Sequence, residues 1–213
     1  MKAKAVDYSL YLVTDRRLLG NKELVATVED AIKGGVTVVQ LREKDVSTQQ
    51  FYSIALAVKK AVLQYKVPFI INDRIDVALA VEADGIHIGQ SDMPLVTARK
   101  LVGPTMVIGV SVATLAEAVA AENEGADYLG VGAVFPTGTK ADARSVSLEL
   151  LSEIKARVNI PVVAIGGINI QNASQVVTTG VDGLAVVSAI IAQKQPGLAA
   201  KNFRQIIDKT PRE

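Results

Sequence analysis

The sequence predicts an α/β fold of the (β/α)8 TIM-barrel type, and three observations support this prediction. Short runs rich in Val, Ile and Leu alternate along the chain with longer helical patterns. Most of these runs are continuously apolar, which is typical of parallel strands that are buried on both faces. Eight such runs fit into 213 residues, close to the lower end of the range for this barrel. We therefore expect one TIM-barrel domain over residues 1–213.

The expected strands are the β-branched runs, at residues 9–13, 37–41, 68–71, 85–88, 106–110, 128–131, 161–165 and 183–187. Ser47 and Gln50 form a capping-box pattern ahead of a helix over residues 51–65, and Thr114 and Glu117 form another ahead of a helix that ends near residue 124. Asn169 is a favourable N-cap for a helix over residues 170–179, and a last helix is expected from about 198 to 208.

An open, doubly wound sheet is the alternative arrangement of the same strands and helices. That fold places its phosphate-binding glycines after the first strand. Here the first strand is followed by Thr14, Asp15 and Arg16, and the glycine pair Gly166 and Gly167 follows the seventh strand. The position of the glycines therefore favours the closed barrel.

Composition excludes several classes of function. The net charge is +1, with 23 basic and 22 acidic residues, so nothing indicates a nucleic-acid partner. No apolar run approaches the roughly 20 residues that span a bilayer, and residues 1–7 lack an apolar signal core, so we expect a cytoplasmic protein without a membrane partner. With no Cys and a single His, a zinc site of nitrogen and sulfur ligands is excluded, and any metal must be a hard cation held by oxygen atoms.

Polar residues and glycines follow nearly every expected strand. The active sites of TIM barrels are built on the loops at the carboxyl ends of the strands, so these residues should meet at one rim. They are Gln40 to Lys44 after the second strand, Asn72 to Arg74 after the third, His87 to Asp92 after the fourth, Ser111 after the fifth, Pro136 to Lys140 after the sixth, Gly166 and Gly167 after the seventh, and Ser188 after the eighth.

Gly166, Gly167 and Ser188 are candidates for binding a phosphate. The loops after strands seven and eight of a barrel often present backbone N–H groups to a phosphate, and glycine lets the backbone approach the oxygen atoms closely. The alternative explanation is that the two glycines only form a tight turn between strand and helix.

Asp73 and Asp92 follow adjacent strands, so their carboxylates can face one site. Two carboxylates with phosphate oxygens and water form a suitable octahedral site for Mg²⁺, which rarely receives a complete set of protein ligands. The alternative explanation is that both residues only cap the helices that follow.

Arg42, Lys44 and Lys140 are expected at the same rim, where they could neutralise the charge of a diphosphate leaving group. Lys140 belongs to a long loop over residues 135–147 that also contains Thr137, Gly138 and Thr139 and could close over the site. The alternative explanations are solvated surface cations, an arginine paired with Glu43, and an ordinary flexible crossover. His87 is not assigned as a base, because a buried histidine with satisfied ring nitrogens is an equally good interpretation.

Seven segments together resemble the thiamine phosphate synthase family over nearly the whole chain. Each segment alone is modest evidence for the family, and the order and spacing of all seven make the resemblance specific. They are YLVTD at residues 11–15, QLREK at 40–44, INDR at 71–74, ADGIHIGQ at 83–90, IGVS at 108–111, PTGTK at 136–140 and VAIGGI at 163–168.

The resemblance implies a transferase that joins hydroxymethylpyrimidine diphosphate to a thiazole phosphate, or to its carboxylate form, with Mg²⁺ as cofactor and pyrophosphate as product. It implies that pyrophosphate leaves first and that the thiazole nitrogen then attacks a pyrimidine methylene cation. Such a reaction requires charge neutralisation and positioning, and no strong protein nucleophile.

The resemblance also implies roles for individual residues. Those expected to bind the diphosphate substrate are Gln40, Arg42, Lys44, Asn72, Ser111 and Lys140. Those expected to contact the thiazole phosphate are Thr137, Thr139, Gly167, Val187 and Ser188. Leu41, Glu43 and Gly138 complete the expected substrate-binding set, Asp73 and Asp92 are the expected Mg²⁺ ligands, and Arg42, Lys44, Ser111 and Lys140 are the expected catalytic residues.

Three alternatives to this function remain. A thiazole tautomerase-like paralogue would be expected to lack the full diphosphate and metal set. Another phosphate-binding barrel would explain Gly166 and Gly167 but not the aspartate pair with three rim cations. A non-catalytic binder of thiamine precursors would keep the phosphate loops without turnover. The oligomeric state is not predicted.

Overall fold

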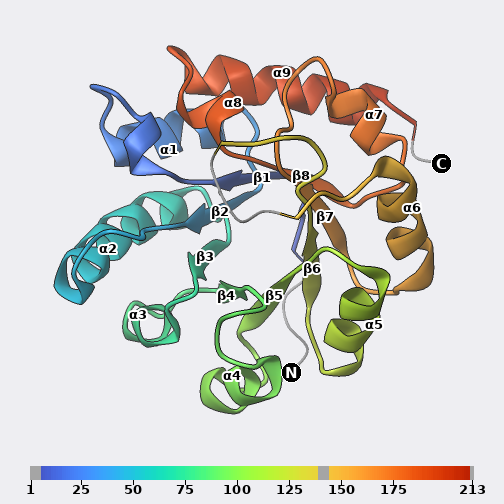
Figure 1. Ribbon diagram of the computed structural model, residues 1–213. Helices are drawn as coiled ribbons and strands as arrows, with labels where there is room; N and C mark the ends of the chain where they lie inside the picture. The colour runs from blue at the N-terminus through green and yellow to red at the C-terminus, as the bar shows by residue number, and fades with distance from the viewer. Residues whose placement is uncertain (1–5, 139–143, 212–213) are drawn as a thin grey trace.

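The structure, a computed structural model, describes residues 6–138 and 144–211, and these residues form a closed barrel of eight parallel strands surrounded by helices (Figure 1). Each strand pairs with the next along the chain, and β8 pairs with β1. The fold class expected from the sequence is therefore confirmed. The single domain over residues 1–213 stays a prediction, because that span includes residues outside the described ranges.

The strands agree with the expected runs to within two residues at each end. They are β1 (Leu10–Val13), β2 (Val38–Leu41), β3 (Phe69–Asn72), β4 (Gly85–Ile88), β5 (Val107–Val112), β6 (Tyr128–Val131), β7 (Val162–Ile165) and β8 (Gly183–Val186).

The described helices lie outside the barrel. They are α1 (Leu24–Lys33), α2 (Thr48–Gln64), α3 (Ile75–Ala80), α4 (Leu95–Val102), α5 (Leu115–Asn123), α6 (Leu148–Arg157), α7 (Ala173–Val177), α8 (Ser188–Ile191) and α9 (Pro196–Lys209), with one 3-10 turn, η1 (Arg16–Leu18). The Ser47–Gln50 capping box is present, with both of its hydrogen bonds, at the start of α2.

The helix expected over residues 170–179 is shorter in the structure. Asn169 accepts a hydrogen bond from the backbone N–H of Gln171, and Asn172 accepts one from the backbone N–H of Asn169, at 2.9 and 2.8 Å. These side chains stabilise a turn over residues 169–172, so α7 begins only at Ala173. The short helix α8, directly after β8, was not expected from the sequence.

Two apolar clusters explain why the strands are apolar on both faces. The outer cluster lies between the strands and the helices and includes Leu12, Leu41 and Phe51. The inner cluster fills the barrel and consists of Tyr8, Tyr11, Val13, Val38, Ile70, Val107, Tyr128, Val163 and Ala185. The barrel interior is therefore a packed core and not a channel.

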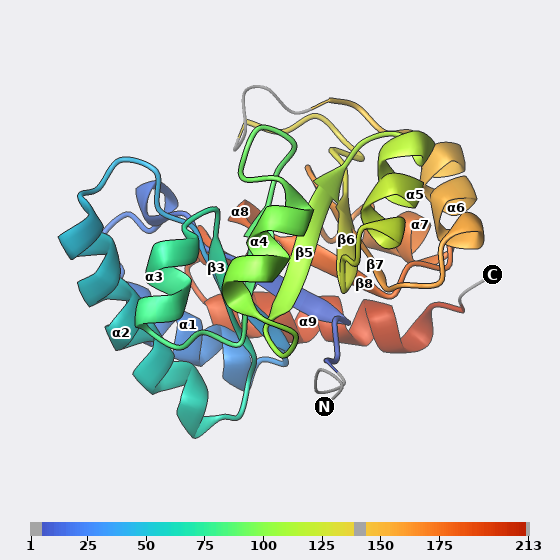
Figure 2. The ribbon, with the colours of Figure 1, turned by 90° about the horizontal axis from the view of Figure 1, so that it is seen from below.

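The rim lies on the side opposite the described N-terminal segment. In Figure 2, β5 points upward toward the loops that follow β4, β5 and β6, while the described N-terminal segment lies below the barrel.

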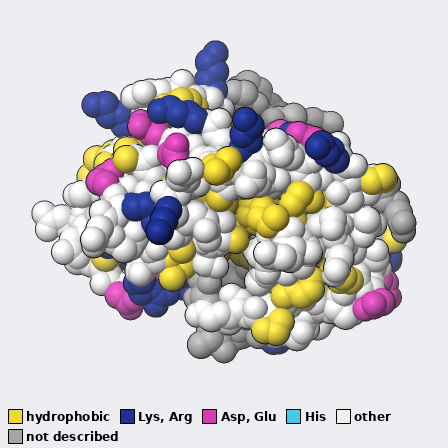
Figure 3. Space-filling model, turned by 90° about the horizontal axis from the view of Figure 1, so that it is seen from above, with side chains coloured by type: hydrophobic (Ala, Val, Ile, Leu, Met, Phe, Trp, Pro, Cys, Tyr) yellow, Lys and Arg dark blue, Asp and Glu magenta, His cyan; other side chains and the backbone are white. Residues whose placement is uncertain are grey.

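Basic and acidic side chains are both scattered over the face shown in Figure 3. Among the described helices, none is long and apolar enough to cross a membrane.

Candidate active site

Asp73 and Asp92 lie next to each other at the rim. Asp73 follows β3 with a φ of 59°, in the left-handed region, and Lys44 donates a hydrogen bond to its carboxylate. Asp92 accepts a hydrogen bond from the backbone N–H of Gly89 at 2.7 Å. Burial raises the pKa of the Asp92 carboxyl above its ordinary value, and the neighbouring Asp73 adds to the increase. A cation between the two carboxylates would relieve their repulsion.

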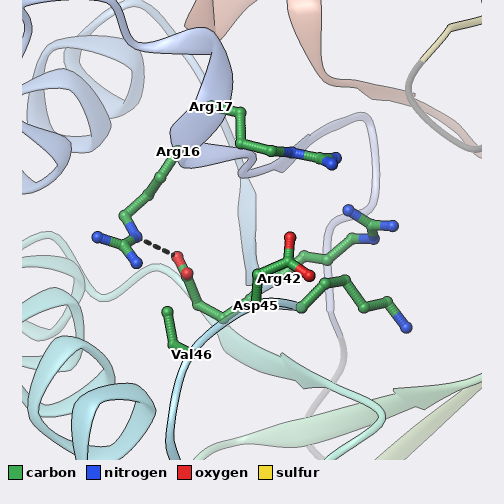
Figure 4. A pocket seen from close by; sticks show the side chains of 7 residues that line it. Arg16, Arg17, Arg42, Asp45 and Val46 are labelled. Atoms are coloured by element: carbon green, nitrogen blue, oxygen red, sulfur yellow. Dashed lines mark hydrogen bonds and ion pairs between the residues drawn. The ribbon is translucent and has the colours of Figure 1, made fainter.

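Basic side chains gather beside this acidic pair. A cavity of about 320 Å³ lies at the loop after β2 and is lined by Arg16, Arg17, Arg42, Glu43, Lys44, Asp45 and Val46. In Figure 4, Arg16 reaches to an acidic side chain while Arg17 and Arg42 extend toward the same side of the pocket. That partner of Arg16 is Glu43, at 2.8 Å, so the arginine paired with Glu43 is Arg16 and not Arg42.

Asp15 anchors two of these cations, which the sequence did not indicate. Its carboxylate accepts hydrogen bonds from Nε and Nη2 of Arg17, at 3.0 and 2.7 Å, and lies 3.8 Å from Nη1 of Arg42. Thr14 also holds this loop, because its hydroxyl accepts the backbone N–H of Arg42 at 3.1 Å. The Arg17 hydrogen bond lowers the pKa of Asp15 below its ordinary value.

The lowered pKa predicts how stability depends on pH. A carboxyl whose pKa is depressed by folding stabilises the protein above its unfolded-state pKa of about 3.9, and this contribution is lost as the pH falls through the folded-state value. We expect Asp15→Asn to be less stable than the parent at pH 7, with the difference shrinking below about pH 4. Urea unfolding at a series of pH values measures this. Asp45→Asn, at an exposed position on the β2 loop, is the control, and a difference between Asp15→Asn and the parent that does not depend on pH would contradict the prediction.

Gly166 and Gly167 pack against the loop that follows β6. The backbone N–H groups of Val134 and Phe135 donate to the carbonyl groups of Ile165 and Gly166, at 3.0 and 3.1 Å. A Cβ atom at Gly167 would lie 2.6 Å from the carbonyl oxygen of Pro136. The glycine pair therefore lies beside the segment that leads to Thr137 and Gly138.

Asn172 and Arg144 also hold this corner of the rim, and the sequence indicated neither. The Asn172 amide donates to the Gly167 carbonyl oxygen at 3.0 Å, which fixes the glycine turn. Arg144 forms two hydrogen bonds of 2.7 Å to Glu117 of α5, and its carbonyl oxygen accepts the backbone N–H of Ala133. These contacts secure the described end of the loop after β6.

A chain of polar side chains crosses the inside of the barrel below the rim. Gln40 Nε2 donates to the Tyr11 hydroxyl at 2.8 Å, and the hydroxyl groups of Tyr11 and Tyr128 are 2.7 Å apart. His87 lies with Nδ1 at 2.9 Å from the Tyr128 hydroxyl and Nε2 at 2.8 Å from Ser111 Oγ. The interpretation of His87 as a buried histidine with partners at both ring nitrogens is confirmed by these distances.

The remaining expected site residues differ in how they reach the rim. Asn72 ends β3 and is almost fully buried. The side chain of Leu41 is fully buried in the outer cluster, so only its backbone can face a substrate. Val187 precedes α8 and packs partly against both clusters, and Ser188, the first residue of α8, is exposed. Thr139 and Lys140 lie outside the described residues.

The described rim therefore brings together an acidic pair, a group of cations and a glycine turn. A family model described as thiamine monophosphate synthase matches residues 10–190, which include all of these features. The chain belongs to the thiamine monophosphate synthase family. It is thus an enzyme of the transferase type, in thiamine biosynthesis, and the resemblance seen in the sequence is confirmed.

Several relatives of this family member match it along nearly their whole length. A thiamine-phosphate synthase of Clostridium acetobutylicum is 56% identical over 206 residues, which cover 97% of this chain and 98% of that relative. A thiamine-phosphate synthase of Desulfitobacterium hafniense is 51% identical over 203 residues, which cover 95% and 98%.

Solved structures agree with the family assignment. A thiamine phosphate pyrophosphorylase from Pyrococcus furiosus aligns with a TM-score of 0.89 and 45% identity, over 96% of this chain and 97% of that one. A (S)-3-O-geranylgeranylglyceryl phosphate synthase from Thermoplasma acidophilum, in complex with sn-glycerol-1-phosphate, aligns with a TM-score of 0.72 and 15% identity, over 95% and 93%. The second likeness shows the barrel fold alone.

Proposed function

We propose that this member of the thiamine monophosphate synthase family joins 4-amino-2-methyl-5-hydroxymethylpyrimidine diphosphate to 4-methyl-5-(2-phosphoethyl)thiazole, or to its carboxylate form, and releases pyrophosphate. The observation that carries the proposal is the arrangement of the rim. The aspartate pair and the cations around Arg42 lie on the β2–β4 side, and the glycine turn lies beside the β6 loop. This arrangement supports separate positions on one rim for a diphosphate and for a monophosphate.

The residues at Asp73 and Asp92 fit a Mg²⁺ ion. Two adjacent carboxylates, one of them with a raised pKa, favour a divalent cation, and Mg²⁺ commonly takes one or two carboxylates together with phosphate oxygens and water. Within residues 6–138 and 144–211, no cluster of three or more acidic or histidine ligands is present, so the proposed site has two protein carboxylates and would need substrate oxygens or water as its other ligands. When bound, Mg²⁺ would supply charge neutralisation to the diphosphate and to the leaving pyrophosphate.

The protein's own groups would drive departure of the leaving group by charge and orientation. Arg42 is held by Asp15 and Thr14 beside the cavity, and Lys44 lies against Asp73, so both cations are near the proposed diphosphate position. Negative charge grows on the pyrophosphate as the C–O bond breaks, so these cations stabilise the transition state more than the bound substrate. The departing electron pair stays on pyrophosphate, and the thiazole nitrogen then forms the new C–N bond to the pyrimidine methylene carbon.

The glycine turn would hold the second substrate. Backbone N–H groups near Gly167, with the Ser188 hydroxyl and Thr137, can donate to a phosphate and fix the thiazole for attack. The roles of Thr139 and Lys140 stay predictions, because both lie outside the described residues. The cytoplasmic location and the absence of nucleic-acid and membrane partners also stay predictions.

One assay tests the proposal. The purified enzyme is mixed with both phosphorylated substrates and Mg²⁺, and thiamine phosphate and pyrophosphate are quantified together. We expect them to form in equal amounts. Binding of both substrates without product would indicate a non-catalytic binder, and isomerisation of the thiazole carboxylate without coupling would indicate a tautomerase. Either result would overturn the proposal.

A further inference from the structure

The polar chain inside the barrel connects two of the proposed substrate-binding residues. It runs from Gln40 through Tyr11, Tyr128 and His87 to Ser111, with each step between 2.7 and 2.9 Å. These five residues come from five different strands, β2, β1, β6, β4 and β5. Both tyrosines are only 1% exposed, so the middle of the chain lies inside the core, while Ser111 at its end is partly exposed.

The barrel is shaped to hold these rings. A Cβ atom at Gly109 of β5 would lie 2.1 Å from Cζ of Tyr128, and one at Gly130 of β6 would lie 2.9 Å from Cε1 of His87. Any larger residue at either position would displace a ring of the chain. The two strand glycines therefore leave space that Tyr128 and His87 occupy, and they give a structural reason for glycine in the middle of buried strands.

The number of hydrogens on each group determines the direction of the chain. Gln40 places Nε2 toward the Tyr11 oxygen and donates to it, and the Tyr11 hydrogen then finds an acceptor within the chain only at the Tyr128 oxygen. The hydrogen of Tyr128 then goes to His87 Nδ1, and a neutral imidazole that accepts at Nδ1 carries its hydrogen on Nε2. His87 Nε2 therefore donates to Ser111 Oγ, which frees the serine hydrogen for a ligand.

The opposite direction requires a different arrangement at both ends of the chain. It requires Gln40 to turn its amide oxygen toward Tyr11, which places two amide hydrogens at the site and makes Ser111 donate to His87. Burial raises the pKa of Tyr11 and of Tyr128 well above the usual tyrosine value, so both phenols keep the hydrogens on which the direction depends.

We propose that Tyr11, Tyr128 and His87 are positioning residues that set the hydrogen-bond pattern of the pyrimidine site, with an acceptor at Gln40 Oε1 and a donor at Ser111. This inference rests on the proposed function, because it takes Gln40 and Ser111 as substrate contacts. It makes the site selective for an aminopyrimidine, whose exocyclic N–H faces Gln40 while an acceptor atom of the same substrate faces Ser111. A 4-oxo analogue directs an oxygen lone pair at the Gln40 oxygen and is rejected, since unpaired buried polar groups are costly.

The histidine tautomer tests the direction of the chain without any turnover. His87 is the only histidine in the sequence, so ¹⁵N-histidine labelling of the whole enzyme gives one imidazole to observe by NMR. We expect a neutral ring with hydrogen on Nε2 and none on Nδ1. Hydrogen on Nδ1 in the free enzyme at neutral pH would overturn the proposal. Because this readout needs no substrate, it stays decisive even if the proposed coupling reaction fails.

Two single-atom variants extend the test. Tyr128→Phe removes the donor to Nδ1 and should weaken the preference for the Nε2–H tautomer. Tyr11→Phe leaves the Tyr128–His87 step in place and should retain that tautomer while it frees the Gln40 amide. If the tautomer is equally fixed in Tyr128→Phe and in the parent, the hydroxyl does not set it and the proposal is wrong.

Substrate discrimination provides the functional readout. The ratio of kcat/KM for the 4-amino substrate to that for its 4-oxo analogue should fall about tenfold in Tyr11→Phe and in Tyr128→Phe, as expected for one hydrogen bond of about 1.4 kcal/mol. Tyr8→Phe is the matched control, because the Tyr8 ring packs against that of Tyr128, with centroids 4.7 Å apart, in the same inner cluster but is not a member of the chain. An unchanged ratio in both variants, or an equal loss in Tyr8→Phe, would assign these tyrosines to packing alone.

Discussion

Replacing Asp92 with alanine should lower turnover at saturating substrates by about two to three orders of magnitude, and Asp73→Ala should have an effect of the same size. Each variant loses half of the carboxylate pair proposed to hold Mg²⁺ against the diphosphate. The remaining carboxylate cannot hold the ion in the same place, so the negative charge that develops on pyrophosphate is less well neutralised. Neither residue belongs to the inner or the outer apolar cluster, so we expect both variants to fold.

Two measurements check this expectation. Single-turnover rates at increasing Mg²⁺ give the effect on chemistry, and Mn²⁺ binding in the presence of inorganic pyrophosphate gives the effect on the metal site itself. Asp208→Ala is the control, because Asp208 pairs with Arg204 on α9 and should be silent in both measurements. Parent-like turnover by both variants in EDTA would contradict the metal assignment.

Replacing Gly167 with valine should weaken binding of the thiazole phosphate while the pyrimidine diphosphate still binds. Gly167 has a φ of 63°, which a β-branched residue adopts only with strain. Its added Cβ would also lie 2.7 Å from Cβ of Phe135 and 2.6 Å from the Pro136 carbonyl oxygen, so the loop that leads to Thr137 must move. Both effects disturb the same phosphate position, and we expect an affinity loss of at least about tenfold, equivalent to roughly 1.4 kcal/mol.

A second glycine separates strain from collision. Gly103 has a φ of 75°, and a Cβ there would meet nothing within 4 Å, so Gly103→Val carries the backbone strain without the clash. Gly103 follows α4, away from the glycine turn. Titration of each folded variant with thiazole phosphate and with pyrimidine diphosphate distinguishes backbone strain from steric collision. Unchanged thiazole phosphate affinity in Gly167→Val would remove this turn from the site, and an equal loss in Gly103→Val would attribute the effect to global strain.

The positions of many rim residues were predictable because a parallel barrel allows few arrangements of its strands and loops. Once eight buried strands alternate with helices, every strand must point the same way, and the residues after each strand must meet at one end. For this reason Asp73 and Asp92, which are 19 positions apart in the sequence, could be placed together before the structure was known. The start of α7 was not predictable in the same way, because the side chains of Asn169 and Asn172 compete locally with the helix.

The roles of other residues at the site could not be assigned from the sequence. Tyr11 and Tyr128 occur in apolar strand segments and resemble ordinary core aromatics, yet their hydroxyl groups meet across 117 positions of sequence. Asp15 resembles an N-cap of the turn that follows it, and it does cap that turn. Its second role, beside Arg42, depends on how β1 and β2 pair. Asn172 resembles a loop residue, and only the fold brings its amide to Gly167.

The sequence by itself determined the order of the strands, the end of the barrel at which the polar residues gather and the family to which they correspond. These follow from local hydrophobic patterns and from the uniform direction of parallel strands, which are properties of single segments. Only the tertiary structure decided which side chains meet across the barrel interior and which carboxylate holds which cation. Those pairings depend on the register between strands and on space left by residues such as Gly109 and Gly130, because the position of an inward-facing side chain is set by its neighbours on other strands.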